Sequence, residues 1–145
     1  MAAEAGDSSV PFDRIAEALR LLDTVDPVRF RRIRRYLGPI LVLERNDAAQ
    51  LPDLRACMPG LDLVLSSPCS RLAATLVHES THARIRAAGV PMRLDTIARE
   101  EILCTLEAIR FLERTPGGRA EADRMRQLLQ DELGKDRPWF YSVLR

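Results

Sequence analysis

The chain has 145 residues, of which 46% are hydrophobic and 30% charged, and its formal net charge at pH 7 is +1. This composition is typical of a soluble globular protein and excludes a disordered or fibrous chain, and the length suits a single domain. The near-zero net charge gives no global field for nucleic acid or an anionic membrane, and no apolar run approaches the roughly 18 residues of a membrane span. We therefore expect no nucleic-acid partner and no membrane association.

The first residues, MAAEAGDSS, are small and partly acidic. They predict a flexible tail over 1–9, before a single domain over 10–145, and they do not match a signal peptide. The three cysteines, Cys57, Cys69 and Cys104, have no C-x-x-C spacing. That pattern favours reduced thiols in a cytoplasmic protein over a disulfide framework.

Two helices are expected first, over 12–23 and 27–37, with Pro27 at the first position of the second. The second helix carries five arginines in RFRRIRRY, residues 29–36. These arginines could form a phosphate-binding patch. We favour a solvated face whose arginines pair with acidic residues of neighbouring helices, because the net charge is near zero.

Two short apolar runs then predict strands, PILVLE at 39–44 and LDLVLSS at 61–67, the second by its alternating leucines. The turn-rich segment between them suggests no firm structure. Three helices should follow, from Ser67 to Ala88, from Asp95 to Arg114 and over 119–133, with Ser67 and Asp95 as capping residues. The aromatic RPWFYS of the last segment is expected to pin the final helix to the core. The predicted fold is α+β and mostly helical, with a small sheet in front of the helix from Ser67 to Ala88.

That helix contains HESTH, with the only two histidines of the chain, His78 and His82. In a helix they project within about 40° of each other, one turn apart, which suits two ligands of one tetrahedral metal. Glu79 points about 100° from His78, too far round to bind the metal but able to reach a water bound to it. This is the division of labour in H-E-x-x-H, with two ligands and one general base. A chance match on an ordinary helix is the alternative.

Zinc needs a third protein ligand, and no histidine remains to supply it. On a helical wheel of the next helix, Glu101 falls in an apolar sector, where a carboxylate needs a partner such as a metal. Glu100 and Glu107 fall on a more polar stripe and are expected to face solvent. Two alternatives stay open: Cys104 as the ligand, or a salt bridge from Glu101 to a buried arginine (Arg71 or Arg86).

The motif VHESTH, with a helical glutamate 19 residues after His82, resembles the gluzincin class of zinc metallopeptidases and small bacterial HExxH proteins. The resemblance implies a minimal zincin-like core, with His78, His82 and Glu101 binding one zinc ion and Glu79 activating water. The class often adds a residue that steadies the oxyanion. Tyr36, Tyr141, Arg71 and Arg86 are the candidates for it in this chain.

The function that follows is a zinc-dependent hydrolase, most simply a metallopeptidase acting on a peptide or protein substrate. In it, strand 61–67 would pair with an extended substrate. The alternative is a zinc-binding structural or regulatory protein without turnover, although such a site has no use for Glu79 as a base. An arginine-patch binding module is the third hypothesis.

Overall fold

The structure of the chain is a computed structural model that describes residues 9–44, 48–51 and 55–135. The expected tail over 1–9 and the aromatic segment RPWFYS lie outside the described residues, apart from Ser9. Most of the described chain is helical, as predicted. Its elements are α1 (Val10–Val25), α2 (Pro27–Tyr36), β1 (Ala48–Leu51), β2 (Ala56–Pro59), α3 (Leu61–Ser66), α4 (Cys69–Ala87), α5 (Ile97–Arg114) and α6 (Arg119–Leu133).

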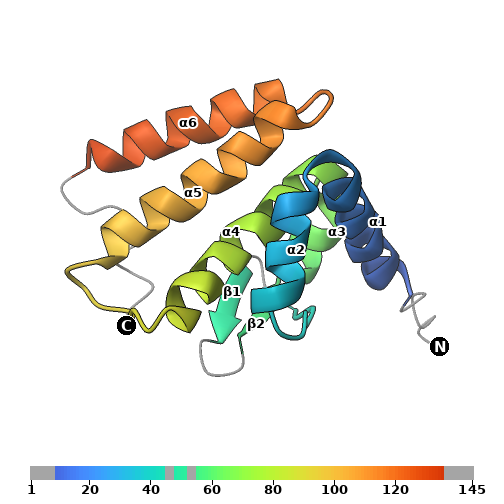
Figure 1. Ribbon diagram of the computed structural model, residues 1–145. Coiled ribbons are helices and arrows are strands. Elements are labelled where there is room, and N and C mark those ends of the chain that lie inside the picture. The colour runs from blue at the N-terminus through green and yellow to red at the C-terminus, as the bar shows by residue number, and fades with distance from the viewer. Residues whose placement is uncertain (1–8, 45–47, 52–54, 136–145) are drawn as a thin grey trace, which may run out of the picture.

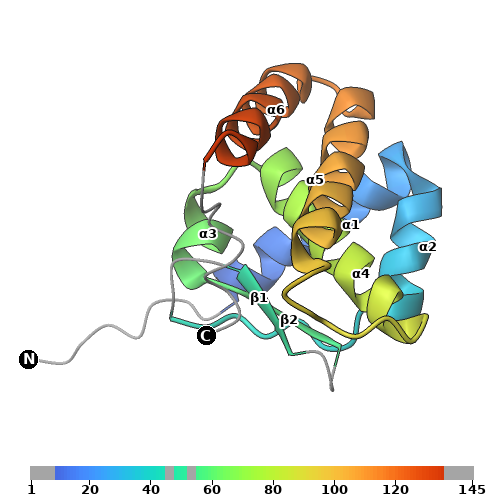
Figure 2. The same ribbon diagram turned by 90° about the vertical axis from the view of Figure 1, so that its left-hand side faces the viewer.

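Helix α4 lies at the centre of the molecule (Figure 1). It packs against α1 and α2 on one side and against α5 on the other, and α6 runs along α5 (Figures 1 and 2). The fully buried side chains at its centre include Leu72, Leu76 and Val77 of α4 and Phe111 and Leu112 of α5. Because α4 has packing partners on both sides, the HESTH motif lies on the most enclosed helix of the fold.

No helix among the described residues is both long enough and apolar enough to cross a membrane.

The β structure is smaller than expected and lies partly elsewhere. Strands β1 and β2 form an antiparallel pair within the segment for which the sequence suggested no structure. The predicted strand at 39–44 is an extended segment beside β2, with isolated parallel bridges from Ile40 to Cys57 of β2 and from Leu43 to Gly60, the residue after β2. The amide of Leu41 donates to the Cys57 carbonyl at 2.8 Å, so this segment extends the sheet without being a regular strand.

The predicted strand at 61–67 is wrong, because these residues form helix α3. Its burial follows the helical period, since Val64 and Ser67, three residues apart, are buried and the two residues between them are exposed. A segment of seven residues with four apolar ones fits either period, and its alternating leucines favoured the wrong one. This segment therefore cannot pair with a substrate as an edge strand.

The long helices agree with the prediction to within two residues at most ends, but their expected caps are wrong. Helix α4 begins at Cys69 after Pro68, and no side chain caps it. Helix α5 begins at Ile97 with Thr96 as the N-cap residue, while the Asp95 carboxylate pairs with Arg93. These differences shift the ends of the helices, but they do not change which face of α4 carries the HESTH residues.

Candidate metal centre

The two histidines of HESTH face the same partner helix. His78 and His82 lie one turn apart on α4, and their Nε2 atoms are 3.1 Å apart. Their ring centroids are 4.9 Å apart, and the His82 side chain is 8% exposed while that of His78 is 17% exposed. The inner histidine is therefore enclosed by protein, and the outer one reaches the surface.

Glu101 of α5 meets both imidazoles. Its Oε2 lies 3.2 Å from His78 Nε2, and its Oε1 lies 3.1 Å from His82 Nε2. The salt bridge that the sequence left open as an alternative for Glu101 is not formed to either arginine named for it. Arg71 pairs with Glu121, and Arg86 pairs with Glu100. The structure thus brings together the three residues that the sequence selected as metal ligands.

This donor set fits a zinc ion. Ligand atoms at about 2.0 to 2.2 Å from a tetrahedral zinc lie roughly 3.3 to 3.6 Å from one another, within a few tenths of an ångström of the separations found here. Oε2 of Glu101 is buried and accepts no hydrogen bond within the described residues, although it faces His78. A cation bound between this carboxylate and the two imidazole nitrogens would satisfy that oxygen.

Glu100, which was expected to face solvent, is buried beside His82. Its Oε1 accepts a hydrogen bond from His82 Nδ1 at 2.6 Å and also pairs with the Arg86 guanidinium. The solvent-facing prediction was wrong because α4 crosses α5 at this point and covers both glutamates. Adjacent glutamates on a helix point about 100° apart. The neighbouring Glu100 and Glu101 could therefore have indicated that two carboxylates approach one histidine from different sides.

The contact with Glu100 sets the tautomer of His82. When Nδ1 carries the proton donated to Glu100, the lone pair of the neutral ring is on Nε2, which faces His78 and Glu101. Carboxylates commonly orient metal-binding histidines in this way. Glu100 is therefore a positioning residue for the candidate centre.

Cys104 lies one turn after Glu101, fully buried, and it also approaches the histidines. One ligand atom each from His78, His82 and Cys104 lie within 4.8 Å of one another. Burial raises the pKa of the Cys104 thiol above 9.0, although the nearby His82 opposes this. The thiol is thus neutral near pH 7 in the absence of a metal, and it remains the alternative ligand that the sequence suggested.

The electrostatics of the cluster favour charge separation between the helices. Burial lowers the pKa of His82, but hydrogen bonds with Cys104, Glu100 and Glu101 outweigh it and raise this pKa to about 12. Burial raises the pKa of Glu101, but the two histidines outweigh that effect and lower it to about 2. Without a metal, a proton on His82 provides the positive charge that the carboxylates require, so a cation entering the site competes with that proton.

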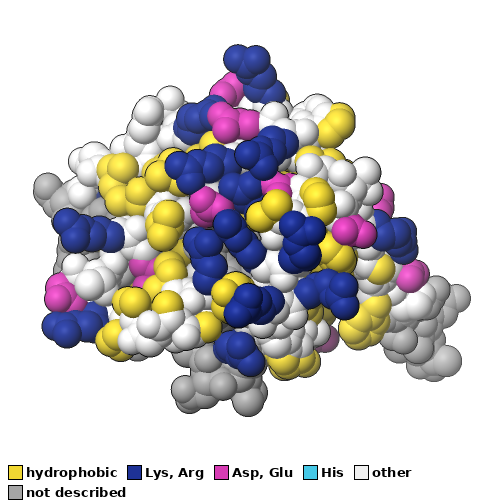
Figure 3. All heavy atoms as spheres, in the orientation of Figure 1, with side chains coloured by type: hydrophobic (Ala, Val, Ile, Leu, Met, Phe, Trp, Pro, Cys, Tyr) yellow, Lys and Arg dark blue, Asp and Glu magenta, His cyan; other side chains and the backbone are white. Residues whose placement is uncertain are grey.

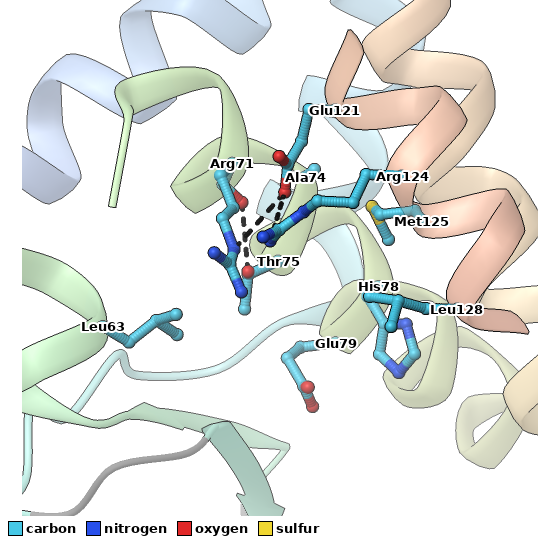
Figure 4. A pocket seen from close by; sticks show the side chains of 10 residues that line it. All are labelled: Leu63, Arg71, Ala74, Thr75, His78, Glu79, Glu121, Arg124, Met125 and Leu128. Atoms are coloured by element: carbon cyan, nitrogen blue, oxygen red, sulfur yellow. Dashed lines mark hydrogen bonds and ion pairs between the residues drawn. The ribbon is translucent and has the colours of Figure 1, made fainter. Parts of the chain in front are cut away.

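Glu79 follows His78 on α4 but is not one of the three residues whose ligand atoms converge. Its side chain is buried, and its charge adds to burial in raising the pKa of Cys57 on β2. Glu79 and His78 both line a cavity of about 310 Å³ between α3, α4 and α6. Figure 4 shows both side chains projecting from α4 on the same side of this cavity. The candidate base and one candidate ligand thus share a space large enough for part of a substrate.

Of the proposed oxyanion donors that the structure describes, only one reaches this cavity. Arg71 lines it, whereas Tyr36 and Arg86 do not. Arg86 is held by Glu100 and by the Val90 carbonyl. Tyr141 lies outside the described residues. The cavity also contains Glu121, Arg124, Met125 and Leu128 of α6, none of which the sequence singled out.

Glu107, the third carboxylate of α5, was also wrongly expected to face solvent. It is buried and pairs with Arg29 of α2 at 2.9 Å and with Arg110 at 2.8 Å. Arg29 in turn pairs with Asp26, the residue that caps α2, at 2.5 Å. Arg32 also contacts Glu107, so two arginines of the basic helix pair with an acid of another helix, as we favoured, although Arg29 is buried and not on a solvated face. Figure 3 shows Lys and Arg side chains gathered on the face where α2 lies, with Asp and Glu side chains among them.

Comparisons with protein-family models, with curated proteins and with solved structures gave no match to this chain.

Proposed function

We propose that the chain is a zinc-dependent hydrolase, in which His78, His82 and Glu101 bind one zinc ion and Glu79 is the general base. The observation that carries this proposal is the convergence of two imidazole nitrogens and both oxygens of one carboxylate within 3.2 Å. The four residues match the gluzincin pattern, which supports a minimal zincin-like core and a peptide bond as the target.

Each residue would have a separate task. A bound zinc ion would polarise the scissile carbonyl and activate a water molecule for attack. Glu79 would take the proton of that water and deliver it to the leaving amine. Glu100 would hold His82 with its Nε2 directed at the site, and His78 would form the edge of the site that opens into the cavity.

The test is metal content per chain, by elemental mass spectrometry on protein purified without a metal-binding tag. We expect about one zinc per chain, a sharp loss of zinc in Glu101→Ala, and unchanged zinc with abolished hydrolysis in Glu79→Gln. A chain that takes up no zinc on dialysis against it would refute the proposal. Loss of zinc in Glu79→Gln would show that Glu79 is a ligand and that these roles are wrong.

A second candidate function is a zinc-binding structural or regulatory protein, and the position of Cys104 favours it. Structural zinc sites are closed by four protein ligands, whereas catalytic sites keep one position open. A thiolate from Cys104 would close the site. Cobalt substitution separates the two, because a thiolate ligand produces a charge-transfer band that Cys104→Ser removes. We expect cobalt to bind without this band, and a strong band would favour the structural function.

A further inference from the structure

The cavity beside the candidate centre has two chemically different ends. At one end are His78 and Glu79 of the HESTH motif. At the other end Arg71 of α4 and Arg124 of α6 converge on Glu121 (Figure 4). A molecule that fills the cavity therefore meets the candidate catalytic residues and a pair of guanidinium groups at the same time.

The guanidinium end keeps an excess of positive charge. Arg71 Nε and Arg124 both contact the same oxygen of Glu121, Oε1, at 3.5 and 3.1 Å. The terminal nitrogens of Arg71 have no hydrogen-bond partner within the described chain, and its side chain is 42% exposed. Two cations thus share one anion, and Arg71 retains donors that can bind a second carboxylate in a fork.

Apart from these charged residues, the cavity wall is largely apolar (Figure 4). Leu63 of α3 lies on one side, and Met125 and Leu128 of α6 lie on the other. A wall of this kind accepts an aliphatic or aromatic side chain, while a few charged groups fix the orientation of the ligand. The cavity thus selects an apolar group attached to a carboxylate.

The spacing along α4 places that carboxylate close to the bond that would be cut. Arg71 and His78 are seven residues apart on the same face of the helix, which corresponds to a rise of about 10.5 Å. An extended peptide advances about 3.3 Å per residue, so roughly three residues span the distance. Two turns of helix thus separate Arg71 from His78, which favours a role in binding the substrate over a role as the oxyanion donor.

We propose that this cavity binds the C-terminal end of a peptide, with the terminal carboxylate on Arg71 and an apolar side chain against Leu63, Met125 and Leu128. The inference rests on the proposed function and adds to it a substrate class: peptides cut within about three residues of a free C-terminus. The reaction is hydrolysis, in which water adds across the amide bond and leaves a new carboxylate and a free amine. No other reactant is needed.

The test uses the 145-residue chain loaded with zinc and three peptides. The first two share one sequence with an apolar C-terminal residue, and end in a free carboxylate and in an amide. The third also ends in an amide and differs in carrying an aspartate directly before it. We expect kcat/KM for the free acid to exceed that for the simple amide by about tenfold or more, as for a lost charge-assisted hydrogen bond. Mass spectrometry of the products should place the cut within the last three residues.

Two substitutions locate the effect. Arg71→Gln should bring the ratio of acid to amide close to one, and Glu121→Gln, which frees Arg71 from its anion, should increase it. The matched control is Arg20→Gln, an exposed arginine of α1 outside the cavity, which should keep the wild-type ratio. Zinc content and urea midpoint are measured on each variant, so that unfolding is not mistaken for lost recognition.

Each outcome separates this inference from the function on which it rests. Equal cleavage of acid and amide, or a ratio that survives Arg71→Gln, would overturn the inference and leave the hydrolase intact. An aspartate peptide cut as fast as the free acid would show recognition of a carboxylate side chain instead of a C-terminus, and would also overturn it. A zinc-loaded chain that cuts none of these peptides or any library peptide would overturn both.

Discussion

Helix α5 carries buried carboxylates at two places, and their partners differ. Near its C-terminal half, Glu107 meets arginines, and the neighbouring Asp26 at the junction of α1 and α2 does the same. Every oxygen of these two carboxylates accepts a hydrogen bond. Near its N-terminus, Glu100 and Glu101 face the histidines of α4, and each keeps one buried oxygen without a hydrogen-bond partner in the described chain.

The carboxylates that pair with arginines form an ion network that stabilises the fold, whereas those that face histidines form a cluster that could bind a ligand. A guanidinium satisfies the oxygens of a carboxylate with a fixed fork of donors, although Arg29 Nε is itself buried without a hydrogen-bond partner in the described chain. Imidazole nitrogens offer a lone pair as readily as a proton, so histidines beside an unsatisfied carboxylate can accept a cation. We call the first set, Asp26, Arg29 and Glu107, the arginine cluster, and the second, His78, His82 and Glu101, the histidine cluster.

The largest expected effect comes from breaking the arginine cluster. Asp26→Ala should lower the free energy of unfolding by about 3 to 5 kcal/mol, because it leaves Arg29 buried without one partner. It also removes the carboxylate that accepts the Arg29 amide at 3.1 Å and caps α2. Denaturation in urea measures the change. Asp23→Ala, at an exposed position of α1, should stay within about 0.5 kcal/mol of wild type, and equal losses in both would refute a special role for the network.

Metal removal should be the next largest effect and should depend on the histidine cluster alone. Zinc at about 100 times its dissociation constant should add about 2.7 kcal/mol to the free energy of unfolding, and a chelator should remove it. His82→Ala should abolish this increment. Asp26→Asn, which weakens the arginine cluster, should retain it. A zinc increment that disappears in Asp26→Asn as well would mean that the two clusters are not independent.

The same substitution at two sites on α5 sharpens the comparison. Glu100→Gln should weaken zinc binding by about 10- to 100-fold, because His82 loses the carboxylate that orients its ring. Glu107→Gln should leave zinc affinity unchanged, since its partners are arginines remote from the histidines. Competition with a chromophoric chelator measures both. If Glu100→Gln binds zinc as tightly as wild type, Glu100 is not a positioning residue.

Much of the histidine cluster could be predicted from sequence because one helix determines it. The helical period places His78 and His82 on one face whatever surrounds them, and the apolar sector around Glu101 indicated which glutamate faces inward. Glu100 could not be assigned in this way, because its burial depends on the angle at which α4 crosses α5. The same holds for Glu107, whose partner Arg29 is 78 residues away in the chain.

The β structure was harder to predict for a different reason. The run at 61–67 is too short for its period to be decisive, and it forms a helix that packs against α1. Strands β1 and β2 lie in a turn-rich segment with no clear alternation, and each is only four residues long. The long helices could therefore be predicted from local sequence, whereas the short strands and α3 depend on contacts between residues distant in the chain.

The smallest expected effect is on the dependence of stability on pH, to which the carboxylates of the arginine cluster contribute. Burial raises the pKa of Asp26 and of Glu107, but the arginines around each outweigh it and hold both below the ordinary values of 3.8 and 4.5. Carboxylates of this kind stabilise the fold above the unfolded-state pKa, and the contribution is lost as pH falls through and below about 4.5.

In metal-free protein the urea midpoint should therefore fall between pH 6 and pH 3. The fall should be shallower in Glu107→Gln, because glutamine does not titrate, and should be unchanged in Glu17→Gln, at an exposed position of α1. Identical pH profiles for Glu107→Gln and wild type would show that Glu107 does not contribute to the acid sensitivity of the fold.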